Sequence, residues 1–145
     1  MRSLFDVNVL IALLDPQHSF HSLAHSFWKE SKSKSWASCP LVENGVIRIL
    51  SGASYPGSSA YSIGHVFNLL RTLIDNSDHE FWADSISLLD KTHFDAKRIL
   101  GPKQLTDVYL LGLAASRGGQ LVTFDRKITP VAVHAASEGH LFVIA

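Results

Sequence analysis

The sequence contains a single cysteine, Cys39, among its 145 residues. One cysteine cannot form a disulfide bond within the chain, and this favours a reducing compartment. The sequence also lacks any apolar run close to the ~18 residues that a membrane-spanning helix needs. Asp6 and Asn8 interrupt the apolar residues near the start of the chain. We therefore expect a cytoplasmic protein without a membrane segment.

An excess of positive charge is missing as well, because 13 Lys and Arg residues balance 13 Asp and Glu residues. Many nucleic-acid-binding domains carry such an excess. Any contact with nucleic acid must therefore come from a local group of cations. With 46% hydrophobic residues, the chain is long enough for one domain, residues 1–145, with a substantial core.

Short apolar strands alternate with helices along the chain. We expect strands at residues 3–5, 35–38, 80–83, 120–124 and 141–144, and helices at residues 7–14, 19–33, 40–50, 60–74 and 106–117. Residues 51–59 read as a turn-rich loop, and residues 85–100 as helical in part. Thr106 is the expected N-cap of its helix, which Gly118 and Gly119 should end. This alternation predicts an α/β fold with a mainly parallel sheet covered on both faces.

Four acidic residues fall where the expected elements begin or end. Asp6 follows the strand at residues 3–5, and Asp125 follows the strand at residues 120–124. Glu43 and Asp107 lie in the first turns of two helices. In a parallel sheet all four positions are near the carboxyl edge, which is where such sheets bind ligands.

The surroundings of these acids point to a shared cation. Glu43 and Asp107 lie on helical faces that are otherwise apolar, and Asp6 lies between apolar residues. Carboxylates crowded together repel one another unless a cation or protons offset their charge. A site made only of oxygen ligands favours Mg²⁺ or Mn²⁺ over zinc. Such ions suit the hydrolysis of phosphodiester bonds.

Ordinary structural roles would also explain some of these residues singly. An acid in the first turn of a helix, such as Asp107, interacts favourably with the helix dipole. An acid after a strand, such as Asp125, often forms a turn. Asp6 and Glu43 are harder to explain in this way. His18, His21 and His25 have helical spacing that could bind zinc, but a polar surface is the simpler interpretation.

Three segments of the chain together resemble the motifs of the PIN-domain ribonucleases, and in particular of the VapC-like toxins of type II toxin–antitoxin pairs. FDVNVLIALLD is similar to the opening acidic motif, with Asp6 as its carboxylate and Asn8 as a supporting polar residue. CPLVENGVIRIL resembles the second motif, with Glu43. QLTDVYLLGLAASRGGQLVTFDRK resembles the third and fourth motifs, with Asp107 and Asp125. Val7 is a departure, because the family often has Thr or Ser there.

The resemblance implies a Rossmann-like α/β/α sandwich and a divalent-metal-dependent endoribonuclease, often a homodimer. It implies that Asp6, Glu43, Asp107 and Asp125 hold Mg²⁺ or Mn²⁺, and that Thr106 and Thr123 orient the acids. It also implies an antitoxin that covers the site with a basic residue. The RNA target stays open, since tRNA, rRNA and mRNA are all compatible.

RNA must also be held, and four cations lie close to the acids in the sequence. Arg126 and Lys127 follow Asp125 directly. Arg48 lies five residues after Glu43, and Lys103 lies four residues before Asp107. These side chains can contact phosphates without reading the base sequence.

Two other functions fit parts of the sequence. The chain could be a degenerate domain that only binds RNA or protein, although four clustered acids would then have no use. FDVNVL also faintly resembles haloacid-dehalogenase phosphatases, but Asn8 replaces their second Asp. One apolar group is formed by Phe67, Leu70, Phe81 and Trp82. We expect most of it to lie in the core and part of it to form a dimer or antitoxin interface.

Overall fold

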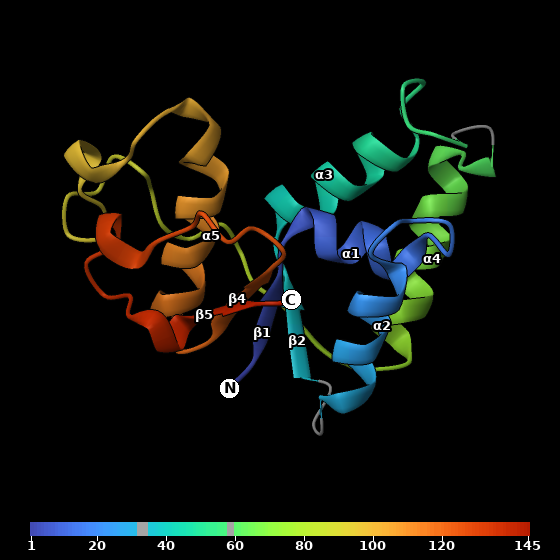
Figure 1. Ribbon diagram of the computed structural model, residues 1–145, viewed down its shortest axis with the longest axis horizontal. Helices are drawn as coiled ribbons and strands as arrows, with labels where there is room; N and C mark the ends of the chain where they lie inside the picture. The colour runs from blue at the N-terminus through green and yellow to red at the C-terminus, as the bar shows by residue number, and fades with distance from the viewer. Residues whose placement is uncertain (32–34, 58–59) are drawn as a thin grey trace.

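The structure is a computed structural model that describes residues 1–31, 35–57 and 60–145. Its strands form one sheet in the order β3-β2-β1-β4-β5, in which every neighbouring pair is parallel (Figure 1). The strands are β1 Ser3–Phe5, β2 Ser35–Ser38, β3 Asp78–Phe81, β4 Gln120–Thr123 and β5 Leu141–Val143. The predicted α/β fold with a mainly parallel sheet is confirmed.

Helices lie on both sides of this sheet, with α1 to α4 on one side and α5 on the other (Figure 1). The α-helices are α1 Val7–Leu14, α2 His21–Glu30, α3 Pro40–Leu50, α4 Ile63–Asp75 and α5 Leu105–Ser116. Short 3₁₀ turns are η2 Ala96–Arg98, η3 Pro102–Gln104, η4 Pro130–Ala132 and η5 Glu138–His140. Within the described ranges, every helix is too short or too polar to cross a membrane.

The sequence predicted most of these elements, with shifts at their ends. The third strand is β3 at residues 78–81 rather than 80–83, and α4 begins at Ile63 because Ser62 caps it by accepting from the His65 amide. The helix expected at 19–33 spans residues 21–30. Its last expected residues, 32 and 33, lie outside the described residues, as do 58 and 59 of the expected loop.

Residues 85–100, expected to be helical in part, contain one short 3₁₀ helix at Ala96–Arg98 and otherwise form turns. Asp90 favours a turn there because it accepts hydrogen bonds from the amide and hydroxyl of Thr92. Phe94 then pairs with Val133 in an isolated antiparallel bridge. Thr106 is not the N-cap of α5, because the preceding 3₁₀ turn starts the helix early and places Gln104 at that position.

The core lies on both faces of the central strands. Phe5 stacks on Trp36 across β1 and β2, with ring centroids 5.6 Å apart. On the other face α5 is buried from Val108 to Ala114. The apolar group noted in the sequence divides between core and surface: Leu70 and Trp82 are buried, whereas Phe67 and Phe81 are 39% and 57% exposed.

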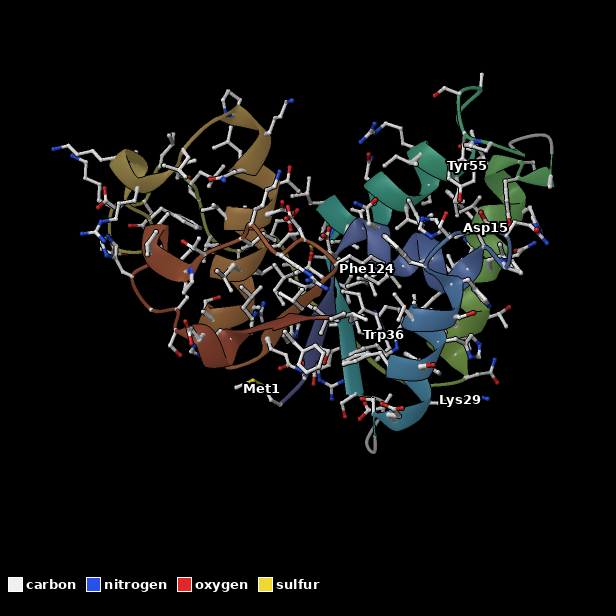
Figure 2. All side chains as sticks on the ribbon, in the orientation of Figure 1. Met1, Asp15, Lys29, Trp36, Tyr55 and Phe124 are labelled. Carbon is white, nitrogen blue, oxygen red and sulfur yellow. The ribbon has the colours of Figure 1, made fainter. Side chains whose placement is uncertain are left out.

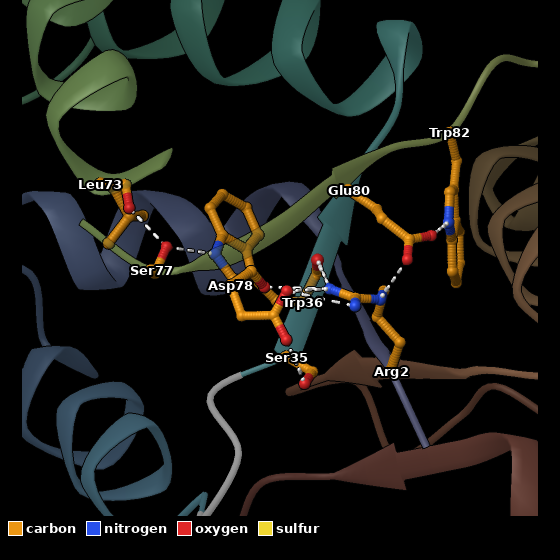
Figure 3. A network of polar contacts seen from close by, with 8 residues as sticks. All are labelled: Arg2, Ser35, Trp36, Leu73, Ser77, Asp78, Glu80 and Trp82. Carbon is orange, nitrogen blue, oxygen red and sulfur yellow. Dashed lines mark hydrogen bonds and ion pairs between the residues drawn. The ribbon is translucent and has the colours of Figure 1, made fainter. Parts of the chain in front are cut away.

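Charged groups at the amino edge of the sheet are paired with one another (Figure 3). The Arg2 guanidinium donates to the Trp36 carbonyl at 3.0 Å and to the Asp78 carboxylate at 3.2 Å. Its Nε lies 3.1 Å from a Glu80 oxygen. Arg2, which directly precedes β1, therefore links β1 to β2 and β3 at the amino edge of the sheet.

A second polar cluster joins α1 to the chain between α3 and α4. Asp15 follows α1, is buried, and accepts hydrogen bonds from the hydroxyls of Tyr55 and Tyr61. Figure 2 shows Asp15 and Tyr55 side by side. These hydrogen bonds hold the pKa of Asp15 below its ordinary value although burial acts in the opposite direction.

Two glycines shape the entry into β4. Gly118 has a φ of 68°, a left-handed conformation that favours glycine and ends α5 as predicted. A Cβ atom on Gly119 would lie 2.6 Å from the Arg2 carbonyl oxygen and 2.7 Å from Trp82 Cη2. The bare backbone at Gly119 therefore lets β4 begin directly beside β1.

We expect Gly119→Ala to lower the melting temperature, because the added methyl group would press on the Arg2 carbonyl just before β1 and on the Trp82 ring. The free energy of unfolding should fall by about 1–3 kcal/mol, as it does for other substitutions that overpack a core. Thermal or urea unfolding measures this change. The control is Gly64→Ala in α4, where a Cβ would meet no heavy atom within 4 Å and alanine gains up to ~1 kcal/mol of helix propensity. Equal stability of both variants would contradict this account.

Candidate functional site

Asp6 occupies the turn between β1 and α1 at the carboxyl edge of the sheet. Its amide donates to the Val122 carbonyl of β4, and its own carbonyl accepts from the amides of Val9 and Leu10 in α1. The side chain is only 6% exposed. Burial raises the pKa of this carboxyl above its ordinary value, while a hydrogen bond from Thr123 opposes the shift and the charge of Asp125 adds to it.

Thr123, at the end of β4, links two of the acids. Its hydroxyl donates to Asp6 Oδ2 at 2.9 Å and accepts from the Asp125 amide at 3.0 Å. Asp125 is exposed, and its Oδ1 accepts from the Lys127 amide at 2.8 Å. Asp125 is therefore both a turn-forming residue and a neighbour of Asp6.

Asp107 lies in the first turn of α5 and faces the same two acids. Burial, then the charges of Asp6 and Asp125, raise the pKa of Asp107 to about 6. Asp107 and Asp125 also line one cavity of about 320 Å³. The structure thus brings together three acids that are separated by up to 119 positions in the sequence.

Glu43 occupies the same edge one strand further along, in the first turn of α3. Its Oε2 accepts a hydrogen bond of 2.6 Å from the hydroxyl of Ser38 at the end of β2. It also lines a groove of about 230 Å³ between α3 and α4, together with Phe67 and Arg71. The charges that raise the pKa of Asp107 do not include that of Glu43.

Ser38 is a residue that the sequence analysis missed. Its hydroxyl proton is given to Glu43, so Nε2 of His79, 2.7 Å away, is the donor in the second contact. Burial, and to a smaller extent the charge of Arg2, lowers the pKa of His79 below its ordinary value. The only signal for Ser38 in the sequence is its place at the end of a strand, five residues before Glu43.

Two other predicted supporting residues, Asn8 and Thr106, are exposed and form no side-chain hydrogen bond with the acids within the described residues. Asn8 is exposed on α1, and the side-chain hydrogen bond to Asp6 comes from Thr123 instead. Thr106 is exposed at the start of α5. His18 and His21 use ring nitrogens in hydrogen bonds with the backbone at Phe20 and Ala12.

The predicted RNA-binding cations are all exposed. Arg48 is near the end of α3, Lys103 is in η3, and Arg126 follows Asp125. Lys127 lines the same cavity as Asp107 and Asp125. Arg98, which the sequence analysis did not select, lines that cavity too.

The acids carry charge that no cationic side chain offsets. Within residues 1–31, 35–57 and 60–145, none of the four forms an ion pair with Lys, Arg or His. In the same ranges no three His, Cys, Asp or Glu side chains already form a metal-binding group. Mg²⁺ keeps several waters and needs only one or two direct carboxylates. An open, all-oxygen site with uncompensated charge therefore fits a hydrated divalent cation.

Known proteins resemble this chain over nearly its whole length. Residues 3–133 match the family model described as PIN domain. Ribonuclease VapC44 of Mycobacterium tuberculosis is 43% identical over 141 residues, which cover 97% of this chain and 98% of that protein. Ribonuclease VapC39 of the same organism is 36% identical over 86% of this chain and 89% of its own length. Ribonuclease VapC38 is 36% identical over 90% and 89%.

Asp107→Asn should stabilise the protein in EDTA at pH 7. The folded-state pKa of about 6 lies above the ordinary value of 3.8, so the stability associated with Asp107 is present below pH 3.8 and lost as pH rises through 6. An asparagine carries no charge at pH 7, so the variant avoids this loss of stability, which is on the order of 1–2 kcal/mol after solvent screening. The melting temperature should therefore rise by a few degrees.

Glu138→Gln, which removes an exposed carboxylate outside the cluster, is the control and should leave the melting temperature almost unchanged. Added Mg²⁺ should then stabilise the wild type more than Asp107→Asn. A variant that is less stable than the wild type in EDTA would contradict the repulsion among the acids.

Proposed function

The chain belongs to the PIN-domain family, and from this membership and its acidic cluster we propose that it is an endoribonuclease toxin of a type II toxin–antitoxin pair. The observation that carries the proposal is the convergence of Asp6, Asp107 and Asp125 without a cationic partner. The relatives named above are ribonucleases, and the PIN-domain match at residues 3–133 includes all four acids. We propose RNA as the substrate and hydrolysis of its phosphodiester bonds as the reaction.

Asp6, Glu43, Asp107 and Asp125 would hold the divalent cation, Mg²⁺ or Mn²⁺. When bound, the ion supplies Lewis acidity, which makes water more acidic and offsets charge on the phosphate. Thr123 fixes one oxygen of Asp6, and Ser38 fixes one oxygen of Glu43. These hydrogen bonds hold the carboxylates in place without neutralising them, so their charge stays available for the cation.

The exposed cations beside the cluster would hold the RNA backbone. Arg126 and Lys127 directly follow Asp125, and Lys127 borders the cavity next to Asp107. Contacts to phosphates position the strand but do not read its bases. The acids themselves would repel RNA, so binding depends on these side chains and on the cation together.

We also propose the partners and the place of action that go with this function. The toxin would act in the cytoplasm, consistent with its single, buried cysteine, and as a homodimer. An antitoxin protein would inhibit it by covering the acidic cluster with a basic side chain. The uncompensated charge of Asp6, Asp107 and Asp125 would favour such a side chain as it favours a metal ion.

Purified wild-type protein should cleave RNA with Mg²⁺ and stop cleaving in EDTA. Asp6→Asn should lower the rate at least about 100-fold, because it removes a buried ligand and leaves the shape of the site unchanged. Gel analysis of cleaved RNA, with RNA-end sequencing, gives the rates and positions. Full activity in all three conditions would rule out the mechanism. RNA binding without cleavage under any condition would favour a degenerate binding domain.

Replacing both Arg126 and Lys127 by alanine should weaken RNA binding and flatten its dependence on salt. Loss of two phosphate contacts on single-stranded RNA should change the slope of log K against log salt by about 1.4. Fluorescence anisotropy over a salt series measures this slope. The control replaces Lys29 and Arg117, which lie at the ends of α2 and α5, the helices that precede β2 and β4. An unchanged slope for Arg126 and Lys127 would contradict their role.

A further inference from the structure

A cavity of about 320 Å³ opens beside Asp107 and Asp125. It is formed by the chain before α5, the first turns of α5 and the chain between β4 and η4. Its volume is at the lower end of the range for small-molecule sites, ~300–1,000 Å³. Its position, with two of the acids in its own wall, makes it continuous with the proposed catalytic site.

The walls of this cavity are mainly apolar, and part of that apolar surface faces solvent. Val108 and Ala132 are buried at the base. Leu100 and Val131 are 83% and 55% exposed at the rim. Apolar side chains in this position leave surface that a flat ligand can cover.

Two polar side chains in the lining have hydrogen-bond donors to offer. Gln104 Oε1 accepts from the Leu100 amide at 3.3 Å, which leaves the side-chain NH₂ group to donate. Thr129 Oγ1 accepts from the Val131 amide at 3.3 Å, so its hydroxyl proton is likewise available. In the described part of the chain, neither donor has an acceptor. Lys127 adds positive charge to the same lining, and Arg98 lies there with its Nε 3.3 Å from an oxygen of Asp95.

We propose that this cavity binds the base of a nucleotide next to the phosphate that is cleaved. This inference rests on the proposed nuclease function. A base has apolar faces that suit the aliphatic walls, and carbonyl oxygens on its edge that suit the donors of Gln104 and Thr129. The adjoining phosphates fit the charge of Lys127. The cavity therefore selects bases with carbonyl oxygens over adenine.

Binding can be measured separately from cleavage in an Asp6→Asn background. The probes are fluorescein-labelled RNA hexamers, U₆ and A₆, and a hexamer of abasic ribonucleotides with the same phosphates. In Mg²⁺ buffer, U₆ should bind about tenfold more tightly than the abasic hexamer, as expected when a base is held by side chains. Fluorescence anisotropy gives the three dissociation constants.

Leu100→Glu should reduce the ratio of the abasic to the U₆ dissociation constant to about 1–2. General charge repulsion would weaken both probes equally and leave this ratio intact. Leu89→Glu is the matched control, because Leu89 is 89% exposed but does not line the cavity; it should keep the ratio near ten. Gln104→Ala should narrow the preference for U₆ over A₆.

The two proposals fail in different ways. A ratio that Leu100→Glu leaves unchanged would overturn the base-binding cavity, even if the wild type cleaves RNA. A ratio that falls as expected, in a protein whose wild type cleaves no RNA, would support the cavity and contradict the nuclease function.

Discussion

The main physical constraint on the proposed site is the repulsion among three carboxylates, those of Asp6, Asp107 and Asp125, which the fold holds together at the carboxyl edge of the sheet. Asp6 is buried at the end of β1, and Asp107 faces it from α5 with a pKa raised to about 6. No ion pair within the described residues offsets this charge. A site that is costly in the free protein is the kind of site that gains most from binding a cation.

Charged side chains are paired at the amino edge of the sheet and unpaired at its carboxyl edge, within the described residues. At the amino edge, Arg2 pairs with Asp78 and Glu80 and holds three strands together. At the carboxyl edge, the hydroxyls of Thr123 and Ser38 orient Asp6 and Glu43 without neutralising them. Charge is thus compensated at the amino edge and left uncompensated at the carboxyl edge, where we propose that a cation binds.

Local sequence patterns were sufficient for most elements, and they pointed to four acids, three of which the structure brings together. They were insufficient where distant contacts or short polar turns decide the conformation. Residues 85–100 form turns because Asp90 binds Thr92 locally and Phe94 pairs with Val133 across the fold. The N-cap of α5 was misplaced because the 3₁₀ turn at Pro102–Gln104 runs directly into the helix. Neither effect leaves a periodic signal in the sequence.

The sequence by itself determined the parallel α/β fold and the family, because alternating strands and helices and the motifs around Asp6, Glu43, Asp107 and Asp125 are local patterns. Only the tertiary structure decided how these acids are grouped. It placed Asp6, Asp107 and Asp125 close enough for their charges to raise the pKa of Asp107. It placed Glu43 one strand away, where its carboxylate accepts a hydrogen bond from Ser38. It also formed the cavity beside Asp107 from two separate segments, residues 98–108 and 125–132. Distances between such segments depend on packing across the sheet, which no local pattern encodes.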